Sequence, residues 1–528
     1  MIEFAELVQR LFFTPGNLAK ARILRSYIER TQDPDRGWAI AILAGKLDLV
    51  LFKRSLINRL IKSRVDPYLF DLCYDYVGEL SETVALLWPT PNTEHKPKLP
   101  SLMEILQTLD SCSKAETEEY VGTLLDQMSP HQRWAFLKIG TGGLRVGMSA
   151  RSVKRVLADF GEVDLDEVEQ LWHAIEPPYQ ELFSWLSGKS GKPDISGRLS
   201  FTPLMLAHPI DLKSLDFINP NEWFAEWKYD GIRVQLANAN NESAIFSRSG
   251  ENISGSFPEL LTEITKDSIL DGELVVMRGK KIGSFNDLQK RLNKKKPTRK
   301  DIDSYPTTVI VYDVLSCQGE SWRKRTFEER RSLLESLFER GIMPDKLFLS
   351  PTLSFADSED LRLLVEDLKH NLEKQFEGLM IKKKTSEYVS GRPRGEWFKW
   401  KKEPHIVDAV LMYAQRGHGK RSSFYSDYTF GLWEENNLLP IGKAYFGFTD
   451  EELKLLDKWV RNNTAERFGP VRGVKPDLVL EIAFDSVHIS NRHKSGVALR
   501  FPRVNRIRWD KPANEADNLE SLKDLVVD

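Results

Sequence analysis

The stretch AEWKYDGIRVQ, residues 225–235, sets a lysine between two aromatic residues and then breaks at once into Asp-Gly. Alternate residues of an extended strand share a face, so Glu226 and Lys228 point the same way. Asp230-Gly231 is typical of a sharp turn, after which the alternation resumes with Arg233. The pattern predicts a lysine at the lip of a pocket, near a carboxylate and a guanidinium. Taken alone, so short a motif is more often a surface strand with solvated charges.

Other segments supply charged groups suited to the same pocket. They are Glu273 in ILDGELVV, Glu377 in FEGLMIKK, and Lys399 and Lys401 in WFKWKK. Each alone is explained equally well as an edge charge that opposes aggregation. Together they offer the lysines and carboxylates that a nucleotide phosphate and its metal ion require.

Composition limits the class of protein. A chain of 528 residues with 41% hydrophobic and 29% charged residues is typical of a soluble globular protein of about three domains. The cysteines Cys73, Cys112 and Cys317 lie far apart, which argues against a disulfide framework or a zinc ribbon and favours a reducing compartment. The start MIEFAELVQR lacks a basic signal region, and charges interrupt the apolar run near residues 39–51. We therefore expect neither secretion nor a membrane span.

The pattern of apolar and polar residues changes twice along the chain. Up to about residue 185, apolar residues recur at helical spacing, as in LAKARILRSYIERT, and a linker rich in Gly, Ser and Pro follows at residues 187–200. Short β-rich runs then alternate with helical patterns up to residue 403. After that, strand-like runs in which apolar and polar residues alternate follow one another, separated by loops. We expect an all-α domain in residues 1–200, an α+β core in 201–403 and a small β-barrel in 404–528.

Five motifs resemble those of a known family. KYDGIR, LDGELV, VYDV, EGLMIK and WFKWK, in this order and at these separations, resemble the serial motifs of the covalent nucleotidyltransferases, and most closely of the ATP-dependent DNA ligases. ALRFPRVNRIRWDK, residues 498–511, is similar to the last motif of that family. LKIGTGGLRVGMSARSVKRVLADF, residues 137–160, is similar to a segment of the helical DNA-binding domain of the larger ligases. The resemblance implies a helical DNA-binding domain, an ATP-grasp-like nucleotidyltransferase core and a C-terminal OB-fold barrel.

The resemblance also implies roles for individual residues. Lys228 would attack the α-phosphate of ATP to give lysyl-AMP and pyrophosphate, with Lys399 and Lys401 neutralising the phosphate. The implied nucleotide contacts are Glu226 at adenine, Tyr312 stacked on the base, Arg248 and Glu273 near the ribose, Arg233 of the first motif, and Arg500 and Arg503 of the last. Glu273 and Glu377 are the implied ligands of Mg²⁺. Which lysine of residues 382–384 faces the site stays open.

Nick sealing requires a grip on duplex DNA through its phosphates, without base readout. AMP passes to the 5′-phosphate at the nick and is then displaced by the adjacent 3′-hydroxyl. The expected DNA contacts in the helical domain are Lys138, Arg145, Lys154 and Arg155, beside a glycine-rich turn and an N-cap at Ser149. The basic run 290–300, in which seven of eleven residues are Lys or Arg, is a solvated loop or a further DNA contact.

Other readings share the lysine chemistry. An RNA ligase and an mRNA-capping guanylyltransferase both fit the KxDG motif, but neither needs the helical segment GGLRVG. An NAD-dependent ligase lacks support because the cysteine spacing of its zinc module is missing. A nick-binding scaffold without catalysis is the alternative from another class. We expect a monomer that clamps nicked DNA in a bacterial cytoplasm, with a hinge near residues 402–404 and a docked helix formed by Leu519, Leu522 and Leu525.

Overall fold

The computed structural model describes residues 1–526 except 47–50, 78, 90–98, 196, 212–213, 280, 371–375, 417–423, 446, 470 and 491–492. Contacts divide the chain into two compact units. Residues 1–162, 177–189 and 404–528 form one, and residues 163–176 and 190–403 form the other. Within the described residues, no helix combines the length and the apolar character needed to cross a membrane.

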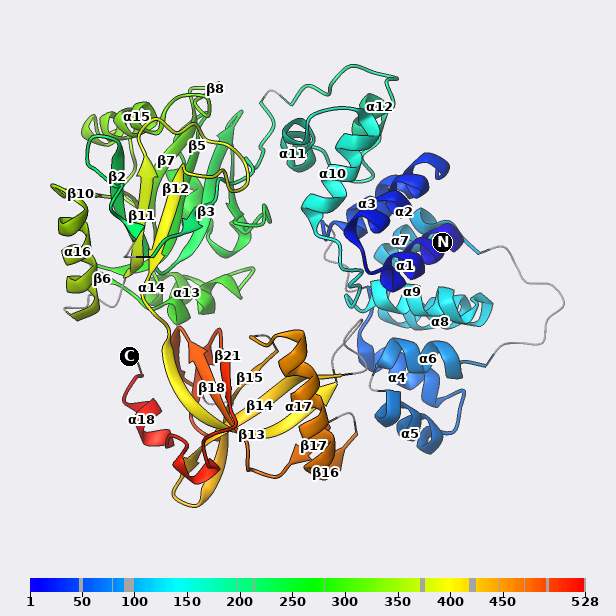
Figure 1. The fold of residues 1–528 in the computed structure, drawn as a ribbon. Coiled ribbons are helices and arrows are strands. Elements are labelled where there is room, and N and C mark those ends of the chain that lie inside the picture. The colour runs from blue at the N-terminus through cyan, green and yellow to red at the C-terminus, as the bar shows by residue number, and fades with distance from the viewer. Residues whose placement is uncertain are drawn as a thin grey trace. The chain divides into compact units, whose positions relative to one another are not determined.

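The described residues up to 186 form helices joined by loops, as their apolar spacing predicts (Figure 1). Capping boxes at Ser101 and Ser113 satisfy the first backbone N–H groups of α7 and α8. The helices are α1 (Ile2–Phe13), α2 (Asn17–Arg30), α3 (Asp35–Leu43), α4 (Arg54–Lys62), α5 (Pro67–Val77), α6 (Leu80–Leu87), α7 (Leu102–Ser111), α8 (Lys114–Gln127), α9 (Pro130–Gly140), α10 (Ala150–Gly161), α11 (Leu165–Ala174) and α12 (Gln180–Leu186). Of these, α11 belongs to the same compact unit as the α+β core.

The α+β core contains two sheets that share no strand. The first has the order β1 (His208–Pro209), β12 (Trp397–Lys401), β11 (Phe376–Lys383), β2 (Trp223–Tyr229) and β10 (Thr352–Leu353). The second has the order β4 (Glu242–Ser247), β3 (Ile232–Ala239), β5 (Ile269–Arg278), β7 (Thr307–Cys317) and β8 (Glu320–Ser321), with β6 (Lys281–Ile282) beside β5 and β9 (Leu347–Leu349) beside β7. The chain passes from the first sheet to the second between β2 and β3, at Asp230-Gly231.

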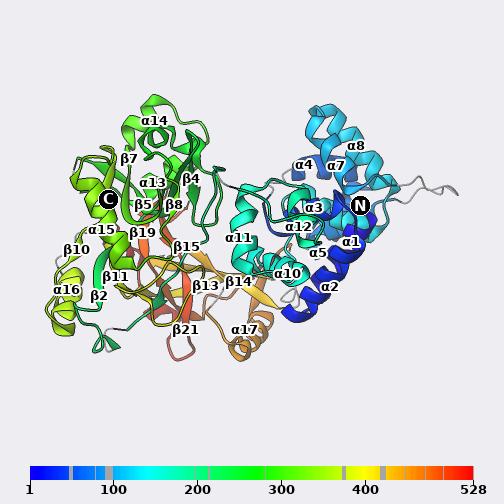
Figure 2. The ribbon, with the colours of Figure 1, turned by 90° about the horizontal axis from the view of Figure 1, so that it is seen from above.

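Helices cover both sheets of the core (Figure 2). α15 (Phe327–Glu339) packs on β7 and buries Leu334 and Leu337 among the apolar residues of the second sheet. α16 (Ser358–His370) packs on β11 and buries Leu361 and Val365 against the first sheet. The short α13 (Phe285–Leu292) lies against β5 and is followed by α14 (Arg299–Ser304).

The C-terminal region is a β domain built around β13 (His405–Arg416), which pairs with β14, β17 and β18. The other elements are β14 (Tyr425–Glu434), β15 (Asn437–Ala444), α17 (Asp450–Asn462), β16 (Thr464–Phe468), β17 (Val471–Val474), β18 (Val479–Phe484), β19 (Ser486–Ile489), β20 (Val497–Arg500), β21 (Arg503–Arg508) and α18 (Leu519–Lys523). Leu519 and Leu522 of α18 join the apolar core of this domain, which confirms the docked terminal helix, whereas Leu525 is exposed.

Candidate active site

Lys228 lies one residue before the end of β2, which runs between β11 and β10 in the first sheet. In the strand register Gly378 of β11 stands directly between Lys228 and Lys401 of β12. The next row on the same face holds Glu226 and Lys399. Gly378 therefore places no side chain between the two lysines of its row. A Cβ at this position would also come within 2.0 Å of the Trp400 carbonyl oxygen.

Glu377, at the start of β11, forms ion pairs with both lysines. Its Oε2 lies 2.5 Å from the Lys228 Nζ and 3.0 Å from the Lys401 Nζ. Burial alone would raise the pKa of this carboxyl, but Lys228 and Lys401 outweigh it and lower the pKa to about 2. Glu377 is therefore an anion that holds the Lys228 amine at a defined place.

More cations surround this group. Burial lowers the pKa of Lys399, and the positive charges of Lys401 and Lys228 lower it further. Two exposed arginines, Arg392 and Arg248, contribute to the same shift and so lie within electrostatic range. Such a concentration of positive charge suits a polyanionic ligand such as a triphosphate.

Glu273 on β5 brings the second sheet to the same site. Burial raises the pKa of Glu273 to about 8, with Lys228 opposing the rise and Glu377 adding to it. The turn packs tightly on β5 here, since a Cβ on Gly231 would lie 2.4 Å from the Leu274 carbonyl oxygen. The Asp-Gly pair therefore provides the close passage between sheets, and no side chain would fit at its glycine.

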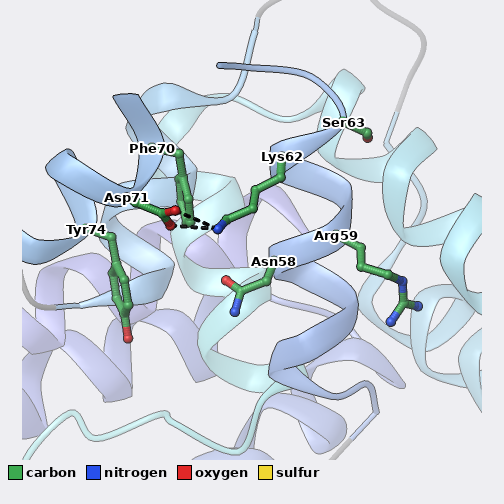
Figure 3. A pocket seen from close by; sticks show the side chains of 7 residues that line it. All are labelled: Asn58, Arg59, Lys62, Ser63, Phe70, Asp71 and Tyr74. Atoms are coloured by element: carbon green, nitrogen blue, oxygen red, sulfur yellow. Dashed lines mark hydrogen bonds and ion pairs between the residues drawn. The ribbon is translucent and has the colours of Figure 1, made fainter. Parts of the chain in front are cut away.

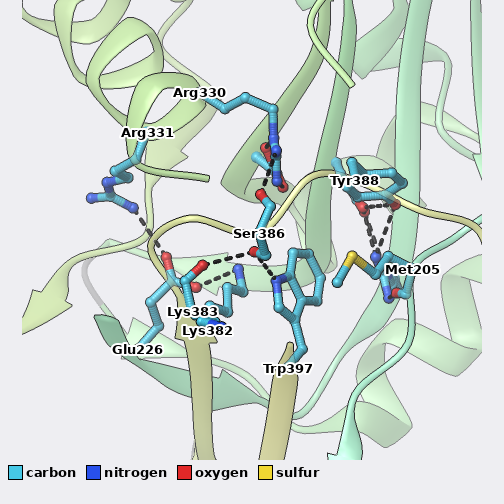
Figure 4. Close-up of polar contacts among 12 residues, drawn as sticks. Met205, Glu226, Arg330, Arg331, Lys382, Lys383, Ser386, Tyr388 and Trp397 are labelled. Atoms are coloured by element: carbon cyan, nitrogen blue, oxygen red, sulfur yellow. Dashed lines mark hydrogen bonds and ion pairs between the residues drawn. The ribbon is translucent and has the colours of Figure 1, made fainter. Parts of the chain in front are cut away.

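Arg233 is engaged within the protein. Its guanidinium forms a two-point ion pair with the buried Asp271, with N–O distances of 2.7 and 3.1 Å. It also donates to the Met205 carbonyl oxygen at 2.8 Å and to the Tyr388 hydroxyl at 3.2 Å. The Tyr388 hydroxyl in turn donates to Asp271 at 2.7 Å. Figure 4 labels two members of this group, Met205 and Tyr388. Arg233 thus joins β3 to β5 and to the loop before β12.

Glu226 is almost fully buried and is held by two cations (Figure 4). Lys382 Nζ lies 2.5 Å from its Oε2, and Arg331 Nη1 donates to its Oε1 at 3.1 Å. Among residues 382–384, Lys382 is thus the lysine that points into the core. Its ammonium also lies 4.5 Å from the ring centre of Tyr312 on β7. Glu226 and Tyr312 therefore share one neighbour, although they belong to different sheets.

The residues present suit a magnesium ion held together with phosphates. Mg²⁺ is commonly bound by one or two carboxylates, with the remaining ligands from substrate phosphates and water. Glu273 and Glu377 influence each other electrostatically and both lie close to Lys228. Across the described parts of the chain, no three His, Cys, Asp or Glu side chains gather into a complete protein cage for a metal. The arrangement fits an ion that arrives with the nucleotide.

Comparison with known proteins identifies the family. The model of the ATP dependent DNA ligase domain matches residues 204–401, that of the DNA ligase N terminus residues 1–158, and that of the ATP dependent DNA ligase C terminal region residues 421–511. A probable DNA ligase of Koribacter versatilis is 30% identical, over 99% of this chain and 96% of that protein. The chain belongs to the ATP-dependent DNA ligases. It is thus an enzyme that uses ATP to seal nicks in duplex DNA.

Further relatives agree with this assignment. DNA ligase 1 of Korarchaeum cryptofilum is 27% identical over 99% of this chain and 97% of that protein. A solved structure titled Pmar-Lig_Pre. superposes with a TM-score of 0.62 at 16% identity, covering 96% of this chain and 99% of that one. The latter shows the shared fold: a helical N-terminal region, a nucleotidyltransferase core and a C-terminal β domain.

The helical region of the ligase presents only part of the expected DNA-contact set. Arg145 and Arg155 are exposed, whereas Lys154 is buried and Lys138 forms a 3.0 Å ion pair with Glu79. Ser149 caps α10 by accepting from the Ser152 backbone N–H at 3.1 Å, as predicted.

A residue that the sequence did not single out supports the glycine-rich turn. Lys20 on α2 is buried and donates to the carbonyl oxygens of Val146 and Gly147. Gly142 and Gly147 both adopt φ of +67°, in the left-handed region that favours glycine. The glycines are thus needed for the shape of the turn itself.

The basic run 290–300 is partly neutralised within the core. Lys290 pairs with Asp287, Arg291 is buried against Glu259, and Lys294 pairs with Asp301. Lys295, Lys296, Arg299 and Lys300 are exposed. The positive face is therefore smaller than the sequence alone indicates.

In the last motif, Arg503 pairs with Asp485 at 3.2 Å and Arg500 lies over the Phe501 ring at 5.2 Å. Arg508 and Lys511 both pair with Asp408 of β13, at 3.0 and 2.8 Å. These two ion pairs join the end of the last motif to β13. Arg500 and Arg503 lie earlier in the motif, outside these ion pairs.

A different hollow, of about 500 Å³, lies between α4 and α5 (Figure 3). Lys62 crosses it to pair with Asp71 at 2.7 Å, and the rings of Phe70 and Tyr74 stack with their centres 6.0 Å apart. Arg59, the other charged residue of its lining, pairs with Glu118, and the hollow lacks the grouped lysines and carboxylates of the Lys228 site.

Proposed function

We propose that Lys228 is the nucleophile of this ligase and becomes lysyl-AMP in the first step. The observation that carries the proposal is the geometry at Glu377, whose Oε2 lies 2.5 Å from the Lys228 Nζ and 3.0 Å from the Lys401 Nζ. The Nζ–Pα bond forms while the bond from Pα to the bridging oxygen breaks, and pyrophosphate leaves. The lysine must lose its protons in the process, and these pass to water, because Glu377, with a pKa of about 2, stays an anion.

The neighbouring groups position the nucleotide. Lys399 and Lys401 neutralise the phosphate in transfer, and this positional and electrostatic catalysis needs no further covalent group. Glu226 accepts a hydrogen bond from the adenine amino group, and Tyr312 stacks on the base. Arg233 acts through Asp271 and keeps β3 and β5 in place. Mg²⁺, held by Glu273 and Glu377, would supply further charge neutralisation at the phosphates.

The remaining contacts follow from the family motifs. Arg248 lies near the ribose, and Arg500 and Arg503 of the C-terminal domain contact ATP during the first step. Arg145 and Arg155 hold DNA phosphates, and their exposure supports this role. The later steps transfer AMP to the 5′-phosphate and release it on attack by the 3′-hydroxyl.

We further propose that the ligase acts as a monomer inside a bacterial cell. Its cysteines Cys73, Cys112 and Cys317 are free, which supports a reducing compartment. Sedimentation with and without nicked DNA tests the monomer, which a dimer at working concentrations would contradict.

The test of the nucleophile is covalent labelling. The protein is incubated with α-³²P-ATP and Mg²⁺ and resolved by denaturing electrophoresis, beside Lys228→Ala and Lys228→Arg. Lys324→Ala, which removes an exposed lysine of the same core, is the matched control. We expect label on the wild type and the control only, because an arginine stays protonated and does not attack. Label on either Lys228 variant would refute the assignment, and so would an unlabelled wild type once prior AMP is excluded by mass.

A further inference from the structure

The carboxylate of Glu226 is held at two points rather than one. Arg331 of α15 donates to its Oε1 at 3.1 Å, and the ammonium of Lys382 lies 2.5 Å from its Oε2. All three side chains are at most 3% exposed. A buried carboxylate held through one oxygen can still turn about its terminal torsion, whereas one held through both oxygens cannot. The plane of the Glu226 carboxylate is therefore fixed.

The two cations reach Glu226 from elements that are themselves fixed in different ways. Lys382 lies on β11, and its ammonium is surrounded by the rings of Tyr312, Phe327 and Trp397 at 4.5 to 4.9 Å from their centres. Arg331 instead belongs to the helix that covers the second sheet. Through this guanidinium the helix reaches Glu226 on the first sheet.

Arg331 is oriented from its outer side as well. Its Nε donates to Glu335, one turn further along α15, at 2.6 Å. Glu335 is 41% exposed, so the row Lys382, Glu226, Arg331, Glu335 alternates cation and anion from the interior to the surface. The charges balance, and no buried group of this row is left with an uncompensated charge. Figure 4 shows Arg331 approaching Glu226 from the helix, apart from the strand that carries Lys382.

We propose that Arg331 is a positioning residue that makes the enzyme selective for a base with a 6-amino group. This inference rests on the proposed contact between Glu226 and adenine. A carboxylate has acceptors only, so it pairs with an amino group and disfavours a carbonyl oxygen at the same place. Discrimination requires the carboxylate to keep one orientation. With Arg331 removed, Glu226 turns about its link to Lys382 and can avoid a carbonyl oxygen, so selectivity falls.

The experiment compares ATP with ITP, whose base carries a carbonyl oxygen in place of the amino group. Rate constants for self-adenylation are measured against nucleotide concentration for the wild type, Arg331→Met and Arg331→Lys. Arg325→Met removes an exposed arginine just before the same helix and is the control. For Arg331→Met we expect the ATP/ITP ratio of second-order rate constants to fall about tenfold to a hundredfold, the range for losing a hydrogen bond to a charged group.

The same series separates positioning from a merely structural role. A structural defect lowers the rates with ATP and ITP in proportion, so an unchanged ratio in Arg331→Met with a lowered rate would overturn the inference. Arg331→Lys keeps a cation at the site and should recover part of the ratio, and it remains available if the methionine variant does not fold. If Arg331→Lys folds but recovers none of the ATP/ITP ratio, the proposal is contradicted.

Glu226→Gln tests the function on which the inference rests. An amide presents either a donor or an acceptor, so this variant should lose most of the selectivity. If Glu226→Gln keeps the wild-type ratio, the proposed adenine contact fails, and the inference fails with it. If Glu226→Gln loses the ratio while Arg331→Met keeps it, only the role of Arg331 is wrong.

Discussion

The ion pair between Arg330 and Asp313 is buried completely, and removal of its cation should destabilise the core strongly. Arg330 Nε and Nη2 donate to the two carboxylate oxygens of Asp313 at 2.8 and 3.0 Å, and both side chains are 0% exposed. Arg330 Nη1 also donates to the carbonyl oxygens of Arg325 and Ser386, at 2.6 and 3.2 Å. Arg330→Met would leave Asp313 with the Val314 N–H as its remaining hydrogen bond at 2.9 Å.

Breaking such a pair costs about 3–5 kcal/mol, because a charge is left buried without a partner. At roughly 2–4 °C per kcal/mol for a unit of about 200 residues, the melting temperature should fall by about 6–20 °C. The assay is thermal unfolding of the full chain, followed together with the loss of self-adenylation. The two signals should move to lower temperature together, since Arg330 lies in the unit that carries Lys228.

The double variant Arg330→Met with Asp313→Leu separates the cost of an unpaired charge from the value of the pair. Replacing a whole buried ion pair by apolar groups is often neutral or stabilising. We therefore expect the double variant to be more stable than Arg330→Met alone. The reasoning is refuted if Arg330→Met melts with the wild type, or if the double variant loses the sum of the two single effects.

Other expectations follow from the site and the helical region. Gly378→Ala should abolish adenylation and lower the melting temperature, because its Cβ would lie 2.0 Å from the Trp400 carbonyl oxygen; a fully active variant in a labelling assay would contradict the packing. Burial raises the pKa of Glu273 from 4.5 to about 8, so the folded state keeps a proton that the unfolded state releases. The free energy of unfolding should therefore fall as the pH rises from 4.5 to about 8. Melting curves in EDTA check this, and Glu273→Gln should flatten the slope. Arg145→Ala and Arg155→Ala should each weaken binding to nicked DNA and lower the salt slope by about 1; titrations at several salt concentrations that give wild-type slopes would exclude phosphate contacts there.

The strands and the cluster around Lys228 were predictable from the sequence because their signals are local. Alternation places Glu226 with Lys228 and Lys399 with Lys401, and the structure keeps both pairs on one face. The passage between two sheets at Asp230-Gly231 was not predictable, since a tight hairpin has the same local pattern.

The partners of the buried charged side chains could not be predicted from the sequence. Arg331 lies 105 residues from Glu226 along the chain, and although it shares a helix face with the buried Phe327 and Leu334, nothing in RTFEERRSLLESLFER indicates which carboxylate it meets. For Lys154 a signal existed, because it precedes Leu157 and Ala158 by three and four residues and so shares their buried face. Lys154 was expected to contact DNA because its segment, residues 137–160, resembles one of a DNA-binding domain.

The passage at Asp230-Gly231 also bears on how the enzyme tolerates change. Lys228 ends one sheet and Arg233 opens the next, so the nucleophile moves with the first sheet while Glu273 moves with the second. A displacement of about 1 Å between reacting groups can cost a hundredfold in rate. Substitutions in the apolar layer under either sheet, far from any phosphate, can therefore slow adenylation without removing a contact to the nucleotide. A bound nucleotide that touches both sheets would in turn brace them, so the apo core should be the form that proteases and heat attack first.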